Sequence, residues 1–133
     1  METDEFLKLI TDQFQFLIAE KFQITKKEKH WLGGVIVEYS NEQYCISILY
    51  DKREQWFTIT LSSIKELNKT HFYFVIELGN HCKIPSSIVS MDDDKQINFF
   101  LSSVSKCLKD MFTTVLQKFN AGEYPGGHLS GQN

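Results

Sequence analysis

The sequence has few of the residues that mark secreted, disulfide-rich domains. It contains two prolines and three cysteines in 133 residues. The cysteines, Cys45, Cys82 and Cys107, are odd in number and lack paired spacing, which favours free thiols in a reducing compartment over a disulfide framework. No stretch has the length and apolarity of a membrane span, and the acidic start does not resemble a signal peptide. We therefore expect a cytoplasmic protein with no membrane contact.

Neither basic nor acidic residues are in large excess. Fourteen basic residues stand against seventeen acidic ones, which gives a net charge of −3. An acidic chain has no general attraction to the phosphate backbone of nucleic acids or to anionic lipid. Nucleic acid is therefore not expected as a partner.

Motifs that carry catalysis or bind cofactors are missing as well. The G-x-S-x-G motif of a nucleophilic serine is absent. Gly33-Gly34 precedes a predicted strand, whereas a glycine-rich phosphate-binding loop precedes a helix. The acidic run 92–94 stands where carboxylates favour the start of a helix. A zinc site would need ligands two to four residues apart, so that a short loop can surround the ion. His81 and Cys82 are adjacent, which argues against a site built from His71, His81, Cys82 and Cys107. We expect no catalytic residue, no cofactor and no metal.

Aromatic residues, by contrast, are abundant. Eleven Phe, five Tyr and two Trp make up 14% of the chain. One small core does not need so many rings, so some ring surface is available for a partner.

The first part of the chain predicts an amphipathic helix. Thr3 stands at the expected N-cap, and the segment from Thr25 to His30, which is rich in lysine, has no apolar period and predicts a solvated loop. Such a basic loop beside a sheet also suits an acidic partner. The apolar stripe of the helix consists of Phe6, Leu9, Ile10, Phe14, Leu17, Ile18 and Phe22.

From residue 35 onward the apolar period changes to two, which is typical of strands. Four strands are expected, near Val35–Ser40, Tyr44–Tyr50, Gln55–Ser62 and Phe72–Leu78, and the short turns between them require antiparallel neighbours. One helical turn is expected between the last two strands.

Alternation assigns the side chains of these strands to two faces. The first face, predicted to pack on the helices, carries Val35, Val37, Tyr39, Tyr44, Ile46, Ile48, Tyr50, Phe57, Ile59, Leu61, Phe72, Phe74, Ile76 and Leu78. The opposite face carries Ile36, Glu38, Cys45, Ser47, Leu49, Trp56, Thr58, Thr60, Tyr73, Val75 and Glu77, and is more apolar than a solvated sheet face usually is. That second face is a candidate recognition surface, with a second core layer or a homodimer contact as its alternatives.

A long amphipathic helix closes the fold. A capping-box pattern at Ser90–Asp93 precedes it, and Gly122 is expected to end it in a left-handed cap. Its stripe comprises Ile97, Phe100, Leu101, Val104, Leu108, Met111, Phe112, Val115, Leu116 and Phe119. The sequence thus predicts a single α+β domain over residues 1–122, a four-stranded antiparallel meander with both helices on one face, followed by a flexible tail over residues 123–133.

The central strands resemble a known class of proteins. The stretch from Trp31 to Asn41, WLGGVIVEYSN, followed by ISILYDKRE from Ile46 to Glu54, is similar to the sheet region of small bacterial immunity-type proteins. The resemblance implies a small, cytoplasmic protein without catalysis that blocks a toxin domain by binding it.

The leading hypothesis is therefore an immunity protein whose second sheet face occludes a toxin. Acidic side chains would complement a basic partner and aromatic ones would anchor it. The predicted contact residues are Glu38, Leu49, Asp51, Glu54, Trp56, Tyr73 and Glu77. The alternatives are a dimeric secretion chaperone for an effector and a small ligand-binding or hydrolytic domain with a pocket between helix and sheet.

Overall fold

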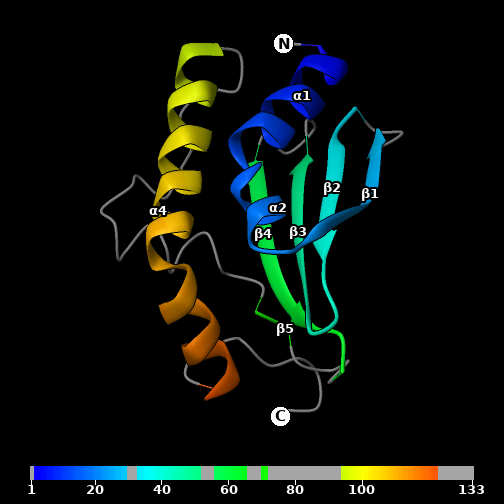
Figure 1. Cartoon of the computed structure of the whole chain (residues 1–133). Helices are drawn as coiled ribbons and strands as arrows, with labels where there is room; N and C mark the ends of the chain where they lie inside the picture. The colour runs from blue at the N-terminus through cyan, green and yellow to red at the C-terminus, as the bar shows by residue number, and fades with distance from the viewer. Residues whose placement is uncertain (1, 30–32, 52–55, 66–69, 72–93, 123–133) are drawn as a thin grey trace.

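The protein folds as an antiparallel sheet with its helices on one face, as seen in a computed structural model (Figure 1). The structure describes residues 2–29, 33–51, 56–65, 70–71 and 94–122. The strands follow one another in the order β1-β2-β3-β4-β5, so the sheet is a meander. The α+β class, the antiparallel meander and the two amphipathic helical regions are as the sequence predicts.

The N-terminal helical region differs in detail from the single helix expected. Helix α1 spans Thr3–Gln13 and a short helix α2 spans Phe16–Ala19. The N-cap is Glu2, one residue before the predicted Thr3, and its backbone N–H donates to the Glu5 carboxylate at 3.2 Å. The break after Gln13 allows Phe14 to be buried, but it leaves Ile18 47% exposed, so the prediction that Ile18 belongs to the core stripe is wrong.

A left-handed residue turns the chain from α2 into the sheet. Lys21 has a φ of 70°, and its N–H donates to the carbonyl of Ile18 at 3.0 Å. The N–H of Phe22 donates to the carbonyl of Leu17 at 2.9 Å, and both of these side chains are buried. This pair of bonds with an apolar contact is the Schellman motif that commonly ends a helix.

The largest departure from the sequence prediction is strand β1, which spans Gln23–Lys29. The segment 25–30 was expected to be a loop because it lacks apolar alternation. All seven residues of β1 are exposed, so neither face of this edge strand requires apolar side chains. Periodicity detects burial, and a strand exposed on both faces gives no such signal.

Strands β2 (Val35–Ser40), β3 (Tyr44–Asp51) and β4 (Trp56–Ser63) form the centre of the sheet. Burial alternates strictly along β2 and β3, and the two are in continuous antiparallel register from Val35↔Tyr50 to Ser40↔Cys45. The predicted assignment of faces is therefore confirmed for these strands. The buried side chains of the helix-facing side are Val35, Val37, Tyr39, Tyr44, Ile46, Ile48, Tyr50, Ile59 and Leu61.

Helix α4 spans Asp94–Asn120 and packs its apolar stripe into the same core. The predicted stripe residues are buried, apart from Met111 and Leu116, which are partly buried against it. Gly122 has a φ of 71° and donates its N–H to the carbonyl of Phe119 at 3.1 Å, which confirms the predicted left-handed end.

Aromatic and polar contacts join the helical layer together. Phe112 of α4 meets Phe16 and Phe22 edge to face, with ring centroids 6.1 and 5.8 Å apart. The buried hydroxyl of Ser105 donates to the Ser102 carbonyl at 3.1 Å and to the Gln13 side chain at 3.4 Å. A buried hydroxyl with two acceptors does not carry the full cost of lost hydration.

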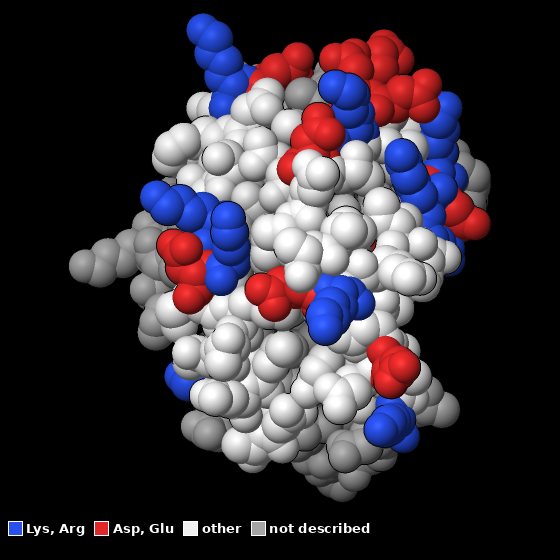
Figure 2. Space-filling view, in the orientation of Figure 1, with Lys and Arg blue, Asp and Glu red and all other residues white. Residues whose placement is uncertain are grey.

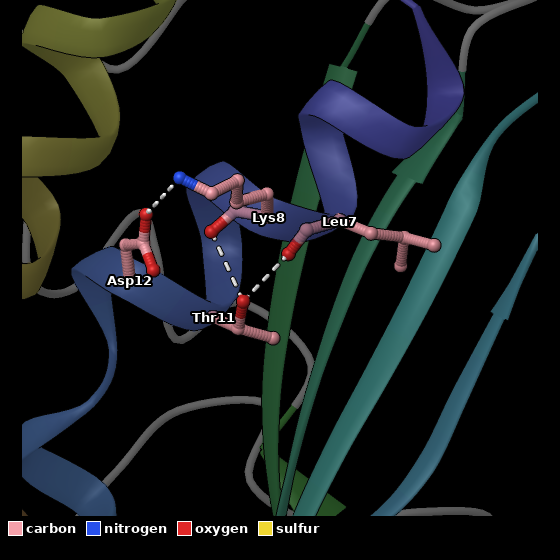
Figure 3. A network of polar contacts seen from close by, with 4 residues as sticks. All are labelled: Leu7, Lys8, Thr11 and Asp12. Carbon is pink, nitrogen blue, oxygen red and sulfur yellow. Dashed lines mark hydrogen bonds and ion pairs between the residues drawn. The ribbon is translucent and has the colours of Figure 1, made fainter.

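The side of α1 away from the strands is polar. Lys8 pairs with Asp12 at 3.6 Å, one turn later, while Leu7 points toward the strands (Figure 3). The Thr11 hydroxyl donates to the carbonyls of Leu7 and Lys8, both at 3.0 Å. Local bonds of this kind satisfy a polar side chain within its own helix.

Some predicted elements lie outside the described residues. These are the fourth predicted strand, Phe72–Leu78, the capping box before α4 and the tail from residue 123. The sheet continues past β4 in a two-residue strand, β5 (Thr70–His71). Among the described helices, none combines the length and the apolarity that crossing a bilayer requires.

Candidate functional site

The face of the sheet away from the helices carries side chains arranged in rows across the strands. Residues that pair across an antiparallel ladder share a face. Glu38 of β2 pairs with Lys26 on one side and Ser47 on the other, and Ser47 pairs with Thr60 of β4. This row is polar from edge to centre, with a carboxylate between an ammonium group and two hydroxyls.

The neighbouring row on the same face is apolar at its centre. Ile36 pairs with Leu49, and Leu49 pairs with Thr58 on its other side. All three are half-buried by their neighbours, although the helices lie on the opposite face. We call the described side chains of this surface the outer face: Ile36, Glu38, Ser40, Cys45, Ser47, Leu49, Asp51, Thr58, Thr60 and Ser62.

Three of the seven predicted contact residues lie on the outer face. Glu38 and Leu49 belong to adjacent rows, and Asp51 follows at the end of β3, where it pairs with Trp56 in the ladder. Asp51 stands four positions after Ser47, the ladder partner of Glu38. The rows that carry the Glu38 and Asp51 carboxylates are therefore about 14 Å apart along the sheet. The apolar row therefore has an acidic side chain on either side. Of the other four, Trp56 is described only by its backbone position in β4, and Glu54, Tyr73 and Glu77 lie outside the described residues.

A polar hollow opens where the outer face meets the edge strand. Its volume is ≈ 670 Å³, and it is broadly open to solvent. Lys21 lines it from the turn after α2, and Gln23 lines it from the start of β1. Glu42 and Gln43 line it from the turn between β2 and β3. Asn41 shapes that turn, because its side-chain oxygen accepts the backbone N–H groups of Gln43 and Tyr44, both at 2.8 Å.

Sequence reasoning missed this hollow and the edge strand beside it. Their residues are polar and exposed, and no spacing within one segment reveals that residues 21–25 and 40–43 come together. The basic composition of the segment after Ile24 was the one available signal. It indicated a charged surface without indicating that the surface is a strand.

Cys45 is a half-buried free thiol on the outer face. Burial raises its pKa, and the nearby Glu38 carboxylate also raises it, while hydrogen bonds with Ser40 and Ser62 act in the opposite direction. A thiol held protonated in this way is a poor nucleophile, because the thiolate is the reactive form. Cys45 therefore acts as a small side chain of the surface.

Cys107 departs from the sequence prediction. It was expected to be a free, apolar helix residue, and it is indeed buried in α4, but it is disulfide-bonded. The expectation of three free thiols is wrong at this residue. The cysteine count therefore no longer favours a reducing compartment, and a cytoplasmic location stays a prediction.

The described part of the chain brings together no set of three His, Cys, Asp or Glu residues that could hold a metal ion. The outer face and the polar hollow instead offer amides, hydroxyls, a short apolar row and separate charges. This arrangement suits contact with another macromolecule. Comparison of the chain with protein-family models, with curated proteins and with solved structures gives no match.

Proposed function

We propose that this chain is a non-catalytic protein-binding module, and that it acts as an immunity protein which neutralises a toxin by direct binding in the cytoplasm. The observation that carries the proposal is the outer face, where the apolar pair Ile36 and Leu49 lies between the carboxylates of Glu38 and Asp51. An apolar centre with a charged rim is the usual anatomy of a protein interface.

The chemistry of the rim indicates the kind of partner. Glu38 and Asp51 lie at opposite ends of the apolar row, so a partner with two basic side chains spaced about 14 Å apart along its contact surface would pair with both. Toxin domains that cleave nucleic acids carry basic surfaces, because their substrates are polyanions. The proposal therefore favours a nuclease-like toxin over a membrane-acting one.

Binding and protection test this function together. The protein is purified with the toxin domain encoded beside its gene, and affinity is measured by calorimetry while survival is scored in cells that express the toxin. We expect a stable complex and survival that depends on it. A complex without protection, or protection without a complex, would refute neutralisation by direct binding.

A dimeric secretion chaperone is the second candidate, because some large apolar side chains are exposed. Phe99 on α4 is 67% exposed, and Ile64 after β4 is 43% exposed. Chaperones of this type present apolar surface to an unfolded client. Sedimentation separates the candidates, since a dimer that keeps an effector soluble without inhibiting any activity supports the chaperone and contradicts the immunity function.

A further inference from the structure

Within the described part of the chain, strand β1 forms an open edge of the sheet. It is the terminal strand in the sheet order and pairs with β2 on one side. All seven of its residues are exposed, and in Figure 1 it lies at the side of the sheet away from α4. A terminal strand presents backbone N–H and C=O groups that can pair with a strand of another chain.

The edge is basic on both of its faces. By register with Val37 and Val35, Lys27 and Lys29 lie on the helix side, whereas Lys26 lies on the outer side, opposite Glu38. Figure 2 shows basic side chains gathered at this edge, next to acidic ones at the start of α1. An added strand would therefore meet positive charge above and below its backbone.

Two of these lysines already have partners within the chain. Lys29 pairs with Asp4 of α1 at 2.8 Å, and Lys26 pairs with Glu28 at 3.5 Å. Lys27 has no acidic partner at ion-pair distance among the described residues. Lys27 is therefore the basic group at the centre of the edge that remains available to an incoming carboxylate.

The regular part of the edge is short and ends beside the polar hollow. Pairing of β1 with β2 is continuous over residues 26–29, and the register shifts between Ile24 and Lys26. The Thr25 hydroxyl at this bulge contacts that of Ser40 at 3.0 Å, and both residues line the hollow. The bulge interrupts the regular edge, so strand pairing is expected over the four residues that follow it, 26–29.

We propose that β1 docks an acidic, extended segment of a partner protein as an additional strand, which pairs with residues 26–29 and continues into the polar hollow. Main-chain hydrogen bonds provide the affinity, and the lysines select the partner by charge. The proposal does not depend on the toxin, because strand addition uses the backbone of β1, which adjoins the outer face and shares only Ser40 of the hollow with it.

A protein segment fits this edge better than a nucleic acid. Glu28 interrupts the basic run, and Glu42 lines the hollow, so a continuous phosphate backbone would meet two carboxylates. Alternate residues of an added strand point to opposite faces, which allows its acidic side chains to reach Lys27 while avoiding Glu28.

The test uses a peptide of about ten residues in which glutamate alternates with threonine or valine, long enough to cover a strand of typical length. A peptide with lysine in place of glutamate is the matched control. Binding to the isotope-labelled full chain is followed by amide chemical shifts and hydrogen exchange. We expect the acidic peptide to shift and protect the amides of β1, and its binding to weaken as salt is raised.

Charge reversal at one site then tests the residue assignment. Lys27→Glu is expected to weaken binding of the acidic peptide about tenfold, which corresponds to about 1.4 kcal/mol. Lys109→Glu makes the same change at an exposed position on α4 and is expected to leave binding unaltered. Both positions are exposed, so circular dichroism should report the same fold for each variant.

Several results would overturn the proposal. Among them are equal binding of the two peptides, no binding of either, and equal effects of the two variants. Tighter binding of an oligouridine probe at β1 would assign the edge to nucleic acid. Protection of the β1 amides that grows with protein concentration in the absence of peptide would assign it to a second copy of the chain. Lysines that serve only to prevent edge-to-edge aggregation would bind none of these probes.

Discussion

The hydroxyl of Tyr44 lies 3.0 Å from Oδ1 and 2.8 Å from Nδ2 of Asn120. Tyr44 begins β3 and Asn120 ends α4, so this contact joins the turn beside the polar hollow to the end of the long helix. The ring of Tyr44 also meets Phe119 edge to face, with centroids 6.2 Å apart. The helical layer thereby holds the sheet at the end where the hollow opens.

Replacement of Asn120 tests this attachment. Asn120→Ala leaves the half-buried Tyr44 hydroxyl without this partner, and we expect it to lower the free energy of unfolding by about 1 kcal/mol. Asn98→Ala is the matched control in the same helix, because the Asn98 side chain bonds to the carbonyl of Asp94 at an exposed position. Urea denaturation of both variants measures the difference, and equal stabilities would show that the contact contributes nothing.

Tyr39 makes stability depend on pH in the alkaline range. Its side chain is fully buried, and its hydroxyl has no hydrogen-bond partner among the residues that the structure describes. Burial, with a smaller contribution from Asp12, raises its pKa from 10.0 to about 12. The contribution of Tyr39 to stability is therefore fully present below pH 10 and is lost as the pH rises from 10 through 12, by about 2 kcal/mol once solvent screening is allowed for.

Tyr39→Phe removes both the buried hydroxyl and its ionisation at alkaline pH. The variant is expected to be as stable as the parent at pH 7, or up to about 1 kcal/mol more stable, because no hydrogen bond is lost. Its melting temperature should fall less between pH 10 and 12 than that of the parent. Tyr44→Phe is the control, since it removes a bonded hydroxyl and should destabilise at pH 7. A Tyr39→Phe variant that is clearly less stable at pH 7 would indicate a partner for this hydroxyl.

The Cys45 thiol should react slowly with iodoacetamide at neutral pH. Its raised pKa shifts the pH profile of alkylation upward relative to a small free thiol. Glu38→Gln removes a negative charge and should move the profile to lower pH. Ser62→Ala removes a hydrogen bond and should move it to higher pH. Mass spectrometry of the labelled protein should find Cys107 alkylated only after reduction. A pH profile of alkylation that is the same in both variants as in the parent would contradict these causes of the raised pKa.

Two glycines are required for different reasons. A methyl group on Gly34 would overlap the backbone carbonyl oxygen of Tyr50 on β3, so Gly34→Ala should cost at least 2 kcal/mol, roughly the upper part of the usual mutational range. Gly122 has open space around it but a φ of 71°, so Gly122→Ala should cost about 1 kcal/mol through backbone strain alone. Thermal denaturation ranks the two variants by stability, and the reverse order would contradict the close approach of Gly34 to Tyr50 on β3.

How well the sequence predicted each element depends on how the element is buried. Strands β2 and β3 bury one face, so their period of two identified both the strands and their core side. Strand β1 has no buried face, and its polar sequence was interpreted as a loop. The N-terminal stripe ran through Phe14 to Ile18 at helical spacing, but spacing alone does not reveal a break that buries Phe14 and exposes Ile18.

The candidate site was predictable to a similar extent. Glu38, Leu49 and Asp51 alternate with core residues, so their common face followed from the period once β2 and β3 were recognised. The polar hollow was not predictable, because it combines the Schellman turn at Lys21 with the turn at Asn41. The disulfide at Cys107 was also missed, since an odd number of cysteines does not reveal which thiols pair.

Toxin inhibition by a Leu49→Lys variant tests the central claim most directly. Leu49 lies in the apolar row between the two carboxylates of the outer face, and Ile18→Lys makes the same kind of change at an exposed position on the helical side. If the outer face binds the toxin, Leu49→Lys should weaken inhibition at least tenfold, about 1.4 kcal/mol, while Ile18→Lys inhibits as the parent does. Unchanged inhibition by a folded Leu49→Lys protein, or equal loss in both variants, would contradict the assignment of the outer face as the binding surface.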